Sequence, residues 1–228
     1  MCTTACIVFG ASHLAPREVK GKRIIEVGSY DLNGSMRPVV TAWKPAEYVG
    51  VDIVPGPGVD IVCAADDTIK KFGKERFDVV ISTETIEHVR DWRKVISNLK
   101  NLCAPEGVIL VTTCMPGHYY HPHPDDFWRY TPDDFKNIFS DCTIETIASD
   151  PRTLGVYIRA TKPQNFKEKD LSAFQLTSII TGGRVLDIND AMLADFKKKY
   201  ERRRKLRAAL KRVERFFVSL GRRSLPGV

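Results

Sequence analysis

Five short runs of mostly Val and Ile constrain the fold of this chain more than any other feature. They begin at Arg23, Tyr48, Val59, Phe77 and Val108, and read RIIEVG, YVGVDI, VDIVCA, FDVVIS and VILVTT. Because apolar residues continue instead of alternating, we expect strands that are covered on both faces. Helix-like patterns lie between them, at 34–43, 67–72 and 87–102. Strands that alternate with helices predict a doubly wound, mostly parallel α/β sheet.

The pattern changes after Asp141. The runs TIETIAS and LGVYIRA alternate more and are separated only by DPRT, which predicts an antiparallel hairpin that closes the sheet. Residues 161–183 have little periodicity and are interpreted as a linker of weak structure. From Asp190 to Leu220, apolar residues recur at three- and four-residue steps, with a break near Arg203, which predicts an amphipathic helix.

The net charge of +7 belongs to this last segment. Residues 191–228 hold 13 Lys and Arg against three acidic residues, a local charge of +10, whereas residues 1–190 hold 22 basic and 25 acidic residues, or −3. Residues 1–190 therefore lack the basic charge that would indicate a nucleic-acid-binding domain. We do not expect nucleic acid to be the partner of this protein. The helix at 190–220 suits an anionic membrane surface, and packing on the body or on a second copy in a homodimer stays an alternative.

Composition adds limits of its own. The chain has 43% hydrophobic and 28% charged residues, which is typical of a globular domain, and no apolar run is long enough to cross a membrane. Its six cysteines include no Cys-x-x-Cys pair, so they are interpreted as small apolar fillers in a reducing compartment. We expect a cytoplasmic protein. Peripheral contact of the helix at 190–220 with a membrane surface is the alternative location.

Acidic and glycine residues follow the strands. The first run continues as Glu26-Val27-Gly28-Ser29-Tyr30, and a glycine at this turn allows close approach of a ligand at the carboxyl ends of the strands. G-x-G-x-x-G is absent because Tyr30 takes the place of the second glycine, so a cofactor without a pyrophosphate fits better. Asp52 ends the second run, where a carboxylate can accept hydrogen bonds from ribose hydroxyls, and Asp66 follows the third.

The segments EVGSYDLNG, YVGVD, CAADD, FDVVISTETIEHV and LCAPEGVILVTT together resemble successive motifs of class I S-adenosylmethionine-dependent methyltransferases, over about residues 22–161. The resemblance implies a sheet of about seven strands with the last antiparallel. It also implies a cofactor site in which Glu26, Gly28 and Ser29 lie against the methionine moiety, Asp52 against ribose and Asp66 near adenine, with Thr83 or Glu84 lining the cleft. A nicotinamide-dependent oxidoreductase would share the sheet, but it would need the missing glycine.

The spacing E-x-x-E-H at Glu84, Glu87 and His88 sets these residues at one strand-to-helix junction. With a histidine from a later loop, His121 or His123, they form a candidate site for a divalent metal. The arrangement resembles ubiquinone-biosynthesis O-methyltransferases and small-RNA 2′-O-methyltransferases, where two Glu and two His hold a metal that binds acceptor hydroxyls. Alternatively, His88 packs under the cleft without an ion.

The loop at 114–131 is long for a compact domain, which favours a functional role. His88, His121 and His123 are candidates for a general base, as is His118, although H-P-H-P also suits a rigid turn. Residues 125–132 resemble the D-x-W-R-x-T-P segment of methyltransferases of surface-glycan pathways, which implies acceptor binding by Trp128 and Arg129. Thr131 and Pro132 are also typical of a helix start.

The sequence therefore predicts a methyltransferase domain at 1–163, a linker at 164–189 and a basic helical tail at 190–228. The expected activity is O-methylation of a small, lipid-linked or glycan-linked acceptor, in which Glu84 contributes to acceptor binding. An RNA 2′-O-methyltransferase and a cofactor-binding scaffold without activity are the alternatives.

Overall fold

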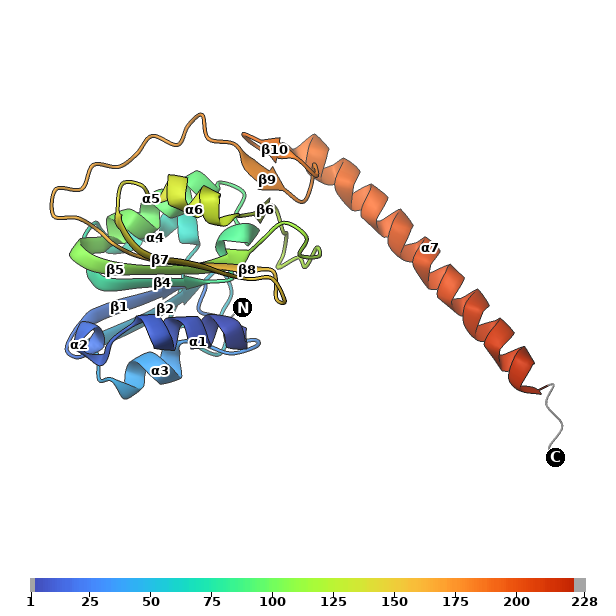
Figure 1. Ribbon diagram of the computed structural model, residues 1–228, viewed down its shortest axis with the longest axis horizontal. Coiled ribbons are helices and arrows are strands. Elements are labelled where there is room, and N and C mark those ends of the chain that lie inside the picture. Colours follow the sequence, from blue (N-terminus) through green and yellow to red (C-terminus); the bar gives the residue numbers. More distant parts are fainter. Residues whose placement is uncertain (1–2, 224–228) are drawn as a thin grey trace. The chain divides into compact units, whose positions relative to one another are not determined.

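The computed structural model describes residues 3–223. The chain forms two compact units, and the boundary between them in the sequence lies between Asp187 and Ile188. The first unit is built on a seven-stranded sheet with the order β3-β2-β1-β4-β5-β8-β7 (Figure 1). Its strands are β1 (Arg23–Val27), β2 (Glu47–Asp52), β3 (Ile61–Val62), β4 (Phe77–Thr83), β5 (Cys103–Cys114), β7 (Thr143–Asp150) and β8 (Gly155–Thr161). Strands β1 to β5 pair in parallel, whereas β8 is antiparallel to β5 and to β7. The predicted doubly wound sheet with its closing hairpin is confirmed.

Helices cover both faces of this sheet. In Figure 1, one face carries α1 (Thr4–His13), α2 (Pro16–Val19) and α3 (Arg37–Ala42), and the other carries α4 (Thr68–Phe72), α5 (Trp92–Leu102) and α6 (Pro132–Ile138). The core under the first face joins Phe9 of α1, Val40 of α3 and Ile24 of β1. Covering on both faces explains why the strands are continuously apolar.

The expected helix at 87–102 begins later than predicted. A 3₁₀ turn, η2 (Ile86–His88), follows β4, and α5 starts at Trp92, where the Asp91 carboxylate accepts a hydrogen bond of 3.1 Å from the Lys94 amide. Asp91 is a good helix N-cap, so it sets the start of α5. His88 therefore stays in the connection at the carboxyl end of β4.

The start of α6 follows the sequence prediction. Thr131 is its N-cap, its hydroxyl accepts a hydrogen bond from the Asp134 amide, and Pro132 occupies the first turn. Another 3₁₀ turn, η1 (Ala65–Asp67), precedes α4.

Residues 164–187 differ from the weakly structured linker that the sequence suggested. Strands β9 (Leu176–Ser178) and β10 (Arg184–Val185) form a small sheet with β6 (Trp128–Arg129), in the order β10-β9-β6. The Arg93 guanidinium donates hydrogen bonds of 2.8–2.9 Å to the carbonyl groups of Leu171, Phe174 and Leu186. Leu171 and Leu176 are buried, and the Arg184 guanidinium also donates to the Asp134 carboxylate, so apolar burial and polar contacts with the first unit's sheet and helices hold a segment that has no periodicity of its own.

The second unit is the long helix α7 (Asp190–Arg223), which confirms the predicted helix. It continues through Arg203, so the break in the apolar stripe does not interrupt it. Leu206 and Leu210 are 61% and 60% exposed. The side chains of Val213, Phe216, Phe217 and Leu220 lie outside the described residues. Within residues 3–223, no helix combines the length and the apolar character needed to cross a bilayer.

Candidate active site

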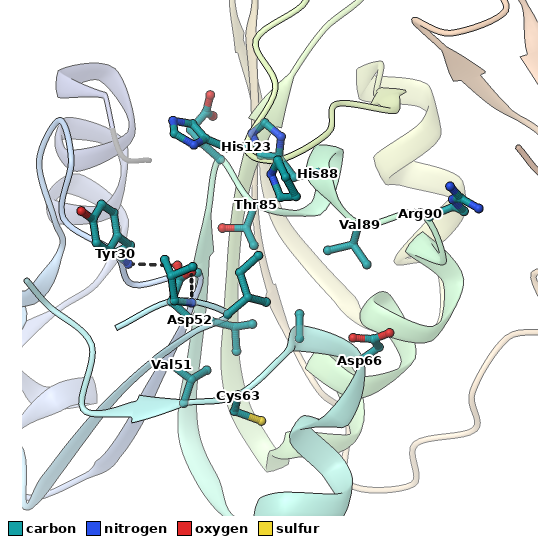
Figure 2. A pocket seen from close by; sticks show the side chains of 17 residues that line it. Tyr30, Val51, Asp52, Cys63, Asp66, Thr85, His88, Val89, Arg90 and His123 are labelled. Carbon is teal, nitrogen blue, oxygen red and sulfur yellow. Dashed lines mark hydrogen bonds between the residues drawn. The ribbon is translucent and has the colours of Figure 1, made fainter. Parts of the chain in front are cut away.

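A cavity of about 570 Å³ opens at the carboxyl ends of β1, β2 and β4 (Figure 2). This volume is within the roughly 300–1,000 Å³ that is usual for small-ligand pockets. Its wall includes Gly28, Asp52 and Asp66, three residues that the sequence assigned to a cofactor. The remaining lining residues are Val27, Tyr30, Val51, Ile53, Val54, Cys63, Ala65, Glu84, Thr85, His88, Val89, Arg90, His123 and Pro124.

Gly28 sits where β1 turns out of the sheet. Its φ of +84° lies in the left-handed region, and a Cβ atom here would stand 1.8 Å from the Thr85 hydroxyl oxygen. A side chain at this position would be strained and would also collide with the connection that follows β4. The glycine is therefore needed for the ends of β1 and β4 to meet at the pocket.

Asp52 is held by the backbone around it. Its carboxylate accepts hydrogen bonds from the amide groups of Tyr30, at 3.2 Å, and Val54, at 3.4 Å. These contacts come from the turns after β1 and β2, and the side chain remains partly exposed on the pocket wall. Asp66 enters the same wall from η1.

The other three predicted cofactor residues do not line the pocket. Glu26 is buried under it, where its carboxylate accepts hydrogen bonds from the hydroxyl groups of Tyr48 and Ser35. Burial raises the pKa of Glu26 above its ordinary value, although the Tyr48 hydrogen bond opposes this rise. Ser29 and Thr83 are also buried, and Glu84 and Thr85 take the place expected for Thr83.

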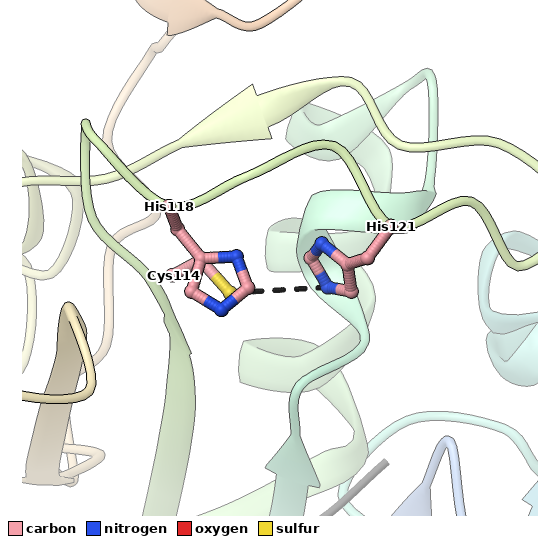
Figure 3. A group of neighbouring side chains, drawn as sticks. All are labelled: Cys114, His118 and His121. Carbon is pink, nitrogen blue, oxygen red and sulfur yellow. Dashed lines mark hydrogen bonds between the residues drawn. The ribbon is translucent and has the colours of Figure 1, made fainter. Parts of the chain in front are cut away.

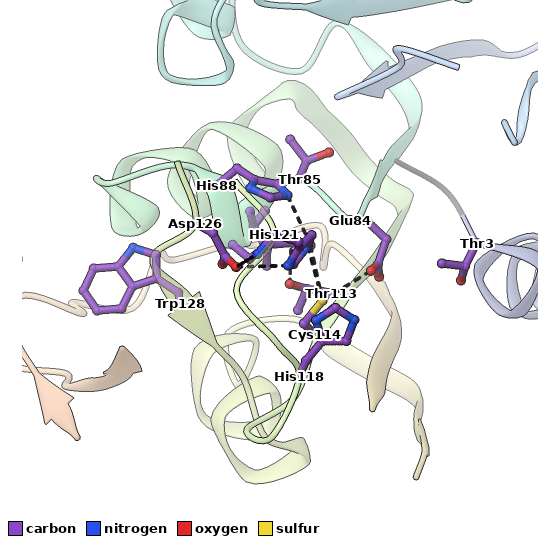
Figure 4. A network of polar contacts seen from close by, with 12 residues as sticks. Thr3, Glu84, Thr85, His88, Thr113, Cys114, His118, His121, Asp126 and Trp128 are labelled. Carbon is purple, nitrogen blue, oxygen red and sulfur yellow. Dashed lines mark hydrogen bonds and ion pairs between the residues drawn. The ribbon is translucent and has the colours of Figure 1, made fainter. Parts of the chain in front are cut away.

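A second, buried group of polar side chains lies beside the pocket, and we call it the acceptor-side cluster: Glu84, Glu87, His88, Cys114 and His121 (Figure 4). Glu84 and His88 belong to both the cluster and the pocket wall. The Cys114 thiol lies 3.4 Å from Glu84 Oε2 and 3.6 Å from Glu87 Oε1. Glu87 Oε1 is 3.9 Å from Nε2 of both His88 and His121. The E-x-x-E-H residues and the loop histidine thus come together as predicted.

Both histidines are oriented by their other ring nitrogen. His88 Nδ1 is 2.7 Å from the Asp125 carbonyl oxygen, and His121 Nδ1 is 3.0 Å from the Asp126 carboxylate. A ring N–H at Nδ1 leaves the Nε2 lone pair free to act as a ligand or base. Nε2 of His88 is buried and has no hydrogen-bond partner among the described residues.

Burial and neighbouring charges shift the pKa values of the titratable residues in the cluster. Burial raises the pKa of Glu84 well above its ordinary value, and the neighbouring Glu87 raises it further. For Glu87, interactions with His121 and His88 outweigh burial and lower the pKa to about 2. Burial alone would lower the pKa of His121, but Asp126 and Glu87 raise it to about 10. A positive charge on His121 therefore balances the buried carboxylates, so this histidine does not suit the role of a free base near neutral pH.

The remaining loop histidines occupy two different places. His123 lies on the pocket wall and is exposed, whereas His118 contacts the cluster, with a ligand atom within 4.8 Å of those of Cys114 and His121 (Figure 3). Burial lowers the pKa of both His118 and His123. Both are therefore neutral near pH 7, which leaves a lone pair on each ring.

The structure corrects the predicted acceptor-binding role of Trp128 and Arg129. The Trp128 side chain is buried, and its indole N–H donates to the carbonyl groups of Val89 and Arg90. The Arg129 guanidinium forms a buried ion pair with Asp126, at 2.5 and 2.7 Å. Both side chains fix the loop, and neither reaches the pocket.

Cys114 is the main residue of this site that sequence analysis missed, since its apolar neighbours suggested a filler. Its thiol pKa is raised by burial and by the two glutamates, and Cys6 of α1 also donates a hydrogen bond to Glu84. The usable signal was its position at the carboxyl end of β5, next to the end of β4, because parallel sheets gather their functional side chains at the carboxyl ends of their strands.

Known proteins resemble both the sequence and the fold. A family model described as a methyltransferase domain matches residues 10–151, which is more than half of the chain. A ubiquinone biosynthesis O-methyltransferase of Azorhizobium caulinodans is 31% identical over 117 residues, covering 46% of this chain and 45% of that protein. One of Rhizobium etli is 27% identical over 122 residues, covering 48% of each. The chain thus spans about half the length of these relatives.

Solved structures share the fold at low identity. A 1,6-didemethyltoxoflavin-N1-methyltransferase of Burkholderia thailandensis, with S-adenosylhomocysteine bound, has a TM-score of 0.57 and 12% identity, covering 70% of this chain and 79% of that one. An S-adenosylmethionine-dependent methyltransferase of Mesorhizobium loti has a TM-score of 0.51 and 16% identity, covering 68% of this chain and 100% of that one. The matched family model shows that the chain belongs to the methyltransferase-domain family, and the sheet order together with these solved structures shows that it has the fold of class I S-adenosylmethionine-dependent methyltransferases.

Proposed function

We propose that this protein transfers the methyl group of S-adenosylmethionine to a hydroxyl oxygen of a small acceptor. The observation that carries the proposal is that Glu84 and His88 belong at once to the pocket and to the acceptor-side cluster. An acceptor bound at the cluster would therefore stand next to a donor in the pocket. Methyl transfer is a displacement at a sulfonium, and its rate depends strongly on such alignment.

Separate residues of the chain would bind the donor and face the acceptor. Asp52, fixed by two backbone amides, is positioned to accept hydrogen bonds from the ribose hydroxyls, and Asp66 lies further along the same wall toward adenine. The turn at Gly28 leaves room for the methionine part of the donor, and the buried Glu26 carboxylate accepts hydrogen bonds from Tyr48 and Ser35 instead of contacting the donor. His88 and Glu84 face the place where donor and acceptor would meet.

The acceptor-side cluster fits a divalent metal. The ligand atoms of Glu87, His88 and His121 lie within 4.8 Å of one another, and those of Glu84 and Glu87 lie within the same distance. His88 Nε2 is buried with no hydrogen-bond partner among the described residues. We propose Glu84, Glu87, His88 and His121 as ligands, with Asp125 and Asp126 orienting the two rings. Such an ion would lower the pKa of an acceptor hydroxyl and orient its oxygen.

Two observations indicate the class of acceptor: the names of the relatives and the basic charge of helix α7. The relatives with 27–31% identity are named as ubiquinone biosynthesis O-methyltransferases. Helix α7 carries eleven Lys and Arg between Lys197 and Arg215, and each such charge near an anionic membrane is worth about 1 kcal/mol. We propose that α7 brings the enzyme to a membrane surface that holds a lipid-linked acceptor.

Transfer of a labelled methyl group tests the reaction. Purified protein is incubated with labelled S-adenosylmethionine and with a panel of catechols, phenols, sugars and RNA, and calorimetry measures donor binding in the same preparation. We expect label on a phenolic or catecholic oxygen. Donor binding without transfer to any acceptor would favour the scaffold alternative, and transfer to RNA would favour the 2′-O-methyltransferase.

Sedimentation with vesicles tests the tail. We expect binding to vesicles with an anionic lipid and none to neutral vesicles, with a loss of binding when Lys197, Lys198 and Lys199 are replaced by Glu. A matched control replaces Lys70, Lys71 and Lys74 of the first unit by Glu, because this changes the net charge equally. Equal binding by both variants would contradict a role for α7.

A further inference from the structure

The acceptor-side cluster contains a sulfur atom among its oxygen and nitrogen donors. Cys114 is the last residue of β5, and its side chain is buried. Its Sγ atom lies 3.4 Å from Glu84 Oε2, 3.6 Å from Glu87 Oε1 and 4.0 Å from His121 Nε2. Figure 4 shows Cys114 close to Glu84 and to the loop histidine His121. We propose that Cys114 is a ligand of the metal, and that the site selects a thiophilic ion of the Zn²⁺ class over Mg²⁺.

The spacing of the donor atoms supports this inference, which rests on the proposed metal site. Glu87 Oε1, His121 Nε2 and Cys114 Sγ form a triangle with sides of 3.6, 3.9 and 4.0 Å. With zinc bonds of about 2.0 Å to oxygen or nitrogen and about 2.3 Å to sulfur, two ligands of a tetrahedral ion stand about 3.5 Å apart. Neighbouring ligands of octahedral Mg²⁺, at about 2.1 Å from the ion, stand only about 3.0 Å apart. The triangle is therefore closer to a tetrahedral site.

A fourth donor, His88, has a ligand atom within 4.8 Å of those of Glu87 and His121. His88 Nε2 lies 3.9 Å from Glu87 Oε1, is buried, and has no hydrogen-bond partner among the described residues. Its orientation is fixed by the 2.7 Å contact of Nδ1 with the Asp125 carbonyl oxygen. A polar atom that is buried without a partner indicates that something absent from the chain completes its contacts. His88, Glu87, His121 and Cys114 together would give two nitrogens, one oxygen and one sulfur.

The chemistry of these donors decides the choice of ion. Thiolate and imidazole favour Zn²⁺ and related transition ions, whereas Mg²⁺ favours carboxylates, carbonyl groups and water. When the ion binds, a sulfur–metal bond forms, the S–H bond of Cys114 breaks, and its proton passes to solvent. Cys114 would thus take the place of Glu84 among the four proposed ligands. Glu84 would lie beside the ion on the side of the pocket, where an acceptor hydroxyl would enter as a fifth ligand.

Cobalt binding tests the sulfur ligand directly, because Co²⁺ adopts zinc sites and its thiolate bonds absorb in the near ultraviolet. The full chain, reduced and freed of metal by a chelator, is titrated with Co²⁺. We expect a near-ultraviolet thiolate band together with the intense visible bands of a four-coordinate ion. Cys114→Ser should lose the thiolate band. Cys103→Ser, at the other end of β5 and away from the cluster, should keep it.

The outcomes separate this inference from the proposed function. Cobalt that binds the unmodified protein without a thiolate band would overturn the sulfur ligand and leave the metal site intact. A failure to bind any divalent ion would overturn both metal proposals, while donor binding in the same sample would report on the pocket. In calorimetry, Cys114→Ser should weaken Zn²⁺ binding by at least about 100-fold and leave Mg²⁺ binding unchanged.

One measurement needs no variant. This is useful because replacement of the buried Cys114 could itself disturb the fold. X-ray absorption at the zinc edge of the zinc-loaded protein should show a sulfur neighbour at about 2.3 Å. Only nitrogen and oxygen neighbours would overturn the inference. Mg²⁺ in large excess should fail to displace the bound zinc, and displacement would likewise contradict the proposed selectivity.

Discussion

The pocket wall and the acceptor-side cluster lie next to each other but are built in different ways. The wall residues Gly28 and Asp52 act through backbone turns directly after their strands. The cluster residues Glu87 and Cys114 are buried, and the charge of Glu87 is balanced by histidines from separate segments. Substitution of Asp52 in the wall should therefore change donor binding with little effect on folding, whereas substitutions in the cluster or its supports should change stability.

The largest effect is expected for Arg129→Ala. This change leaves the buried Asp126 carboxylate without its guanidinium, and breaking a buried ion pair costs about 3–5 kcal/mol of unfolding free energy. Urea denaturation measures the loss. The control Arg152→Ala, with a side chain 90% exposed, should stay within about 0.5 kcal/mol of the unmodified protein. Unchanged stability with a raised KM for the acceptor would restore the acceptor-binding role first predicted for Arg129.

The next effect, Asp52→Ala, belongs to the pocket wall. Two hydrogen bonds from ribose to a charged group are worth about 1.5–3 kcal/mol each, so the donor Kd should rise by at least about 100-fold. Calorimetry with S-adenosylmethionine measures the change. Asp67→Ala, one residue beyond Asp66 and outside the lining residues, is the matched control. Unchanged affinity in Asp52→Ala would remove the ribose role.

The cluster should give the metal-free protein a distinctive pH dependence. Because the pKa of His121 is raised to about 10 from an ordinary 6.5, the charged ring stabilises the fold. This contribution is fully present below about pH 6.5 and is lost as the pH rises toward about 10. Urea midpoints of chelator-treated protein measured across this window should fall with rising pH. His121→Asn should flatten the curve, and an unchanged slope would contradict this account.

The smallest effect is expected for Trp128→Phe. The ring is buried, so most of its packing is kept, but the indole N–H no longer reaches the Val89 and Arg90 carbonyl groups. Loss of this hydrogen bonding should cost about 1 kcal/mol of unfolding free energy. Donor and acceptor kinetics should not change. A raised acceptor KM with unchanged stability would show instead that Trp128 contacts the acceptor.

Some predictions succeeded because local chemistry decides them. The continuous Val and Ile runs gave the right strands, and Thr131 and Pro132 marked the start of α6. Helix α1 and the small sheet at 176–185 were not predicted, because α1 lacks a clear apolar stripe and β9 and β10 are only three and two residues long. Such elements are stable only against a body that is already formed.

The order of motifs along the chain determined the sheet, the methyltransferase family and the strand ends at which Gly28, Asp52 and Asp66 stand, since each of these depends on neighbours in sequence. Only the tertiary structure decided which polar side chains are buried together. In the folded chain, the side chains of Trp128 and Arg129 hold the loop in place by hydrogen bonds, and the Cys114 thiol lies near the carboxylates of two glutamates. The physical reason is that burial and charge balance are set by residues far apart in the chain, and no local pattern records those distances.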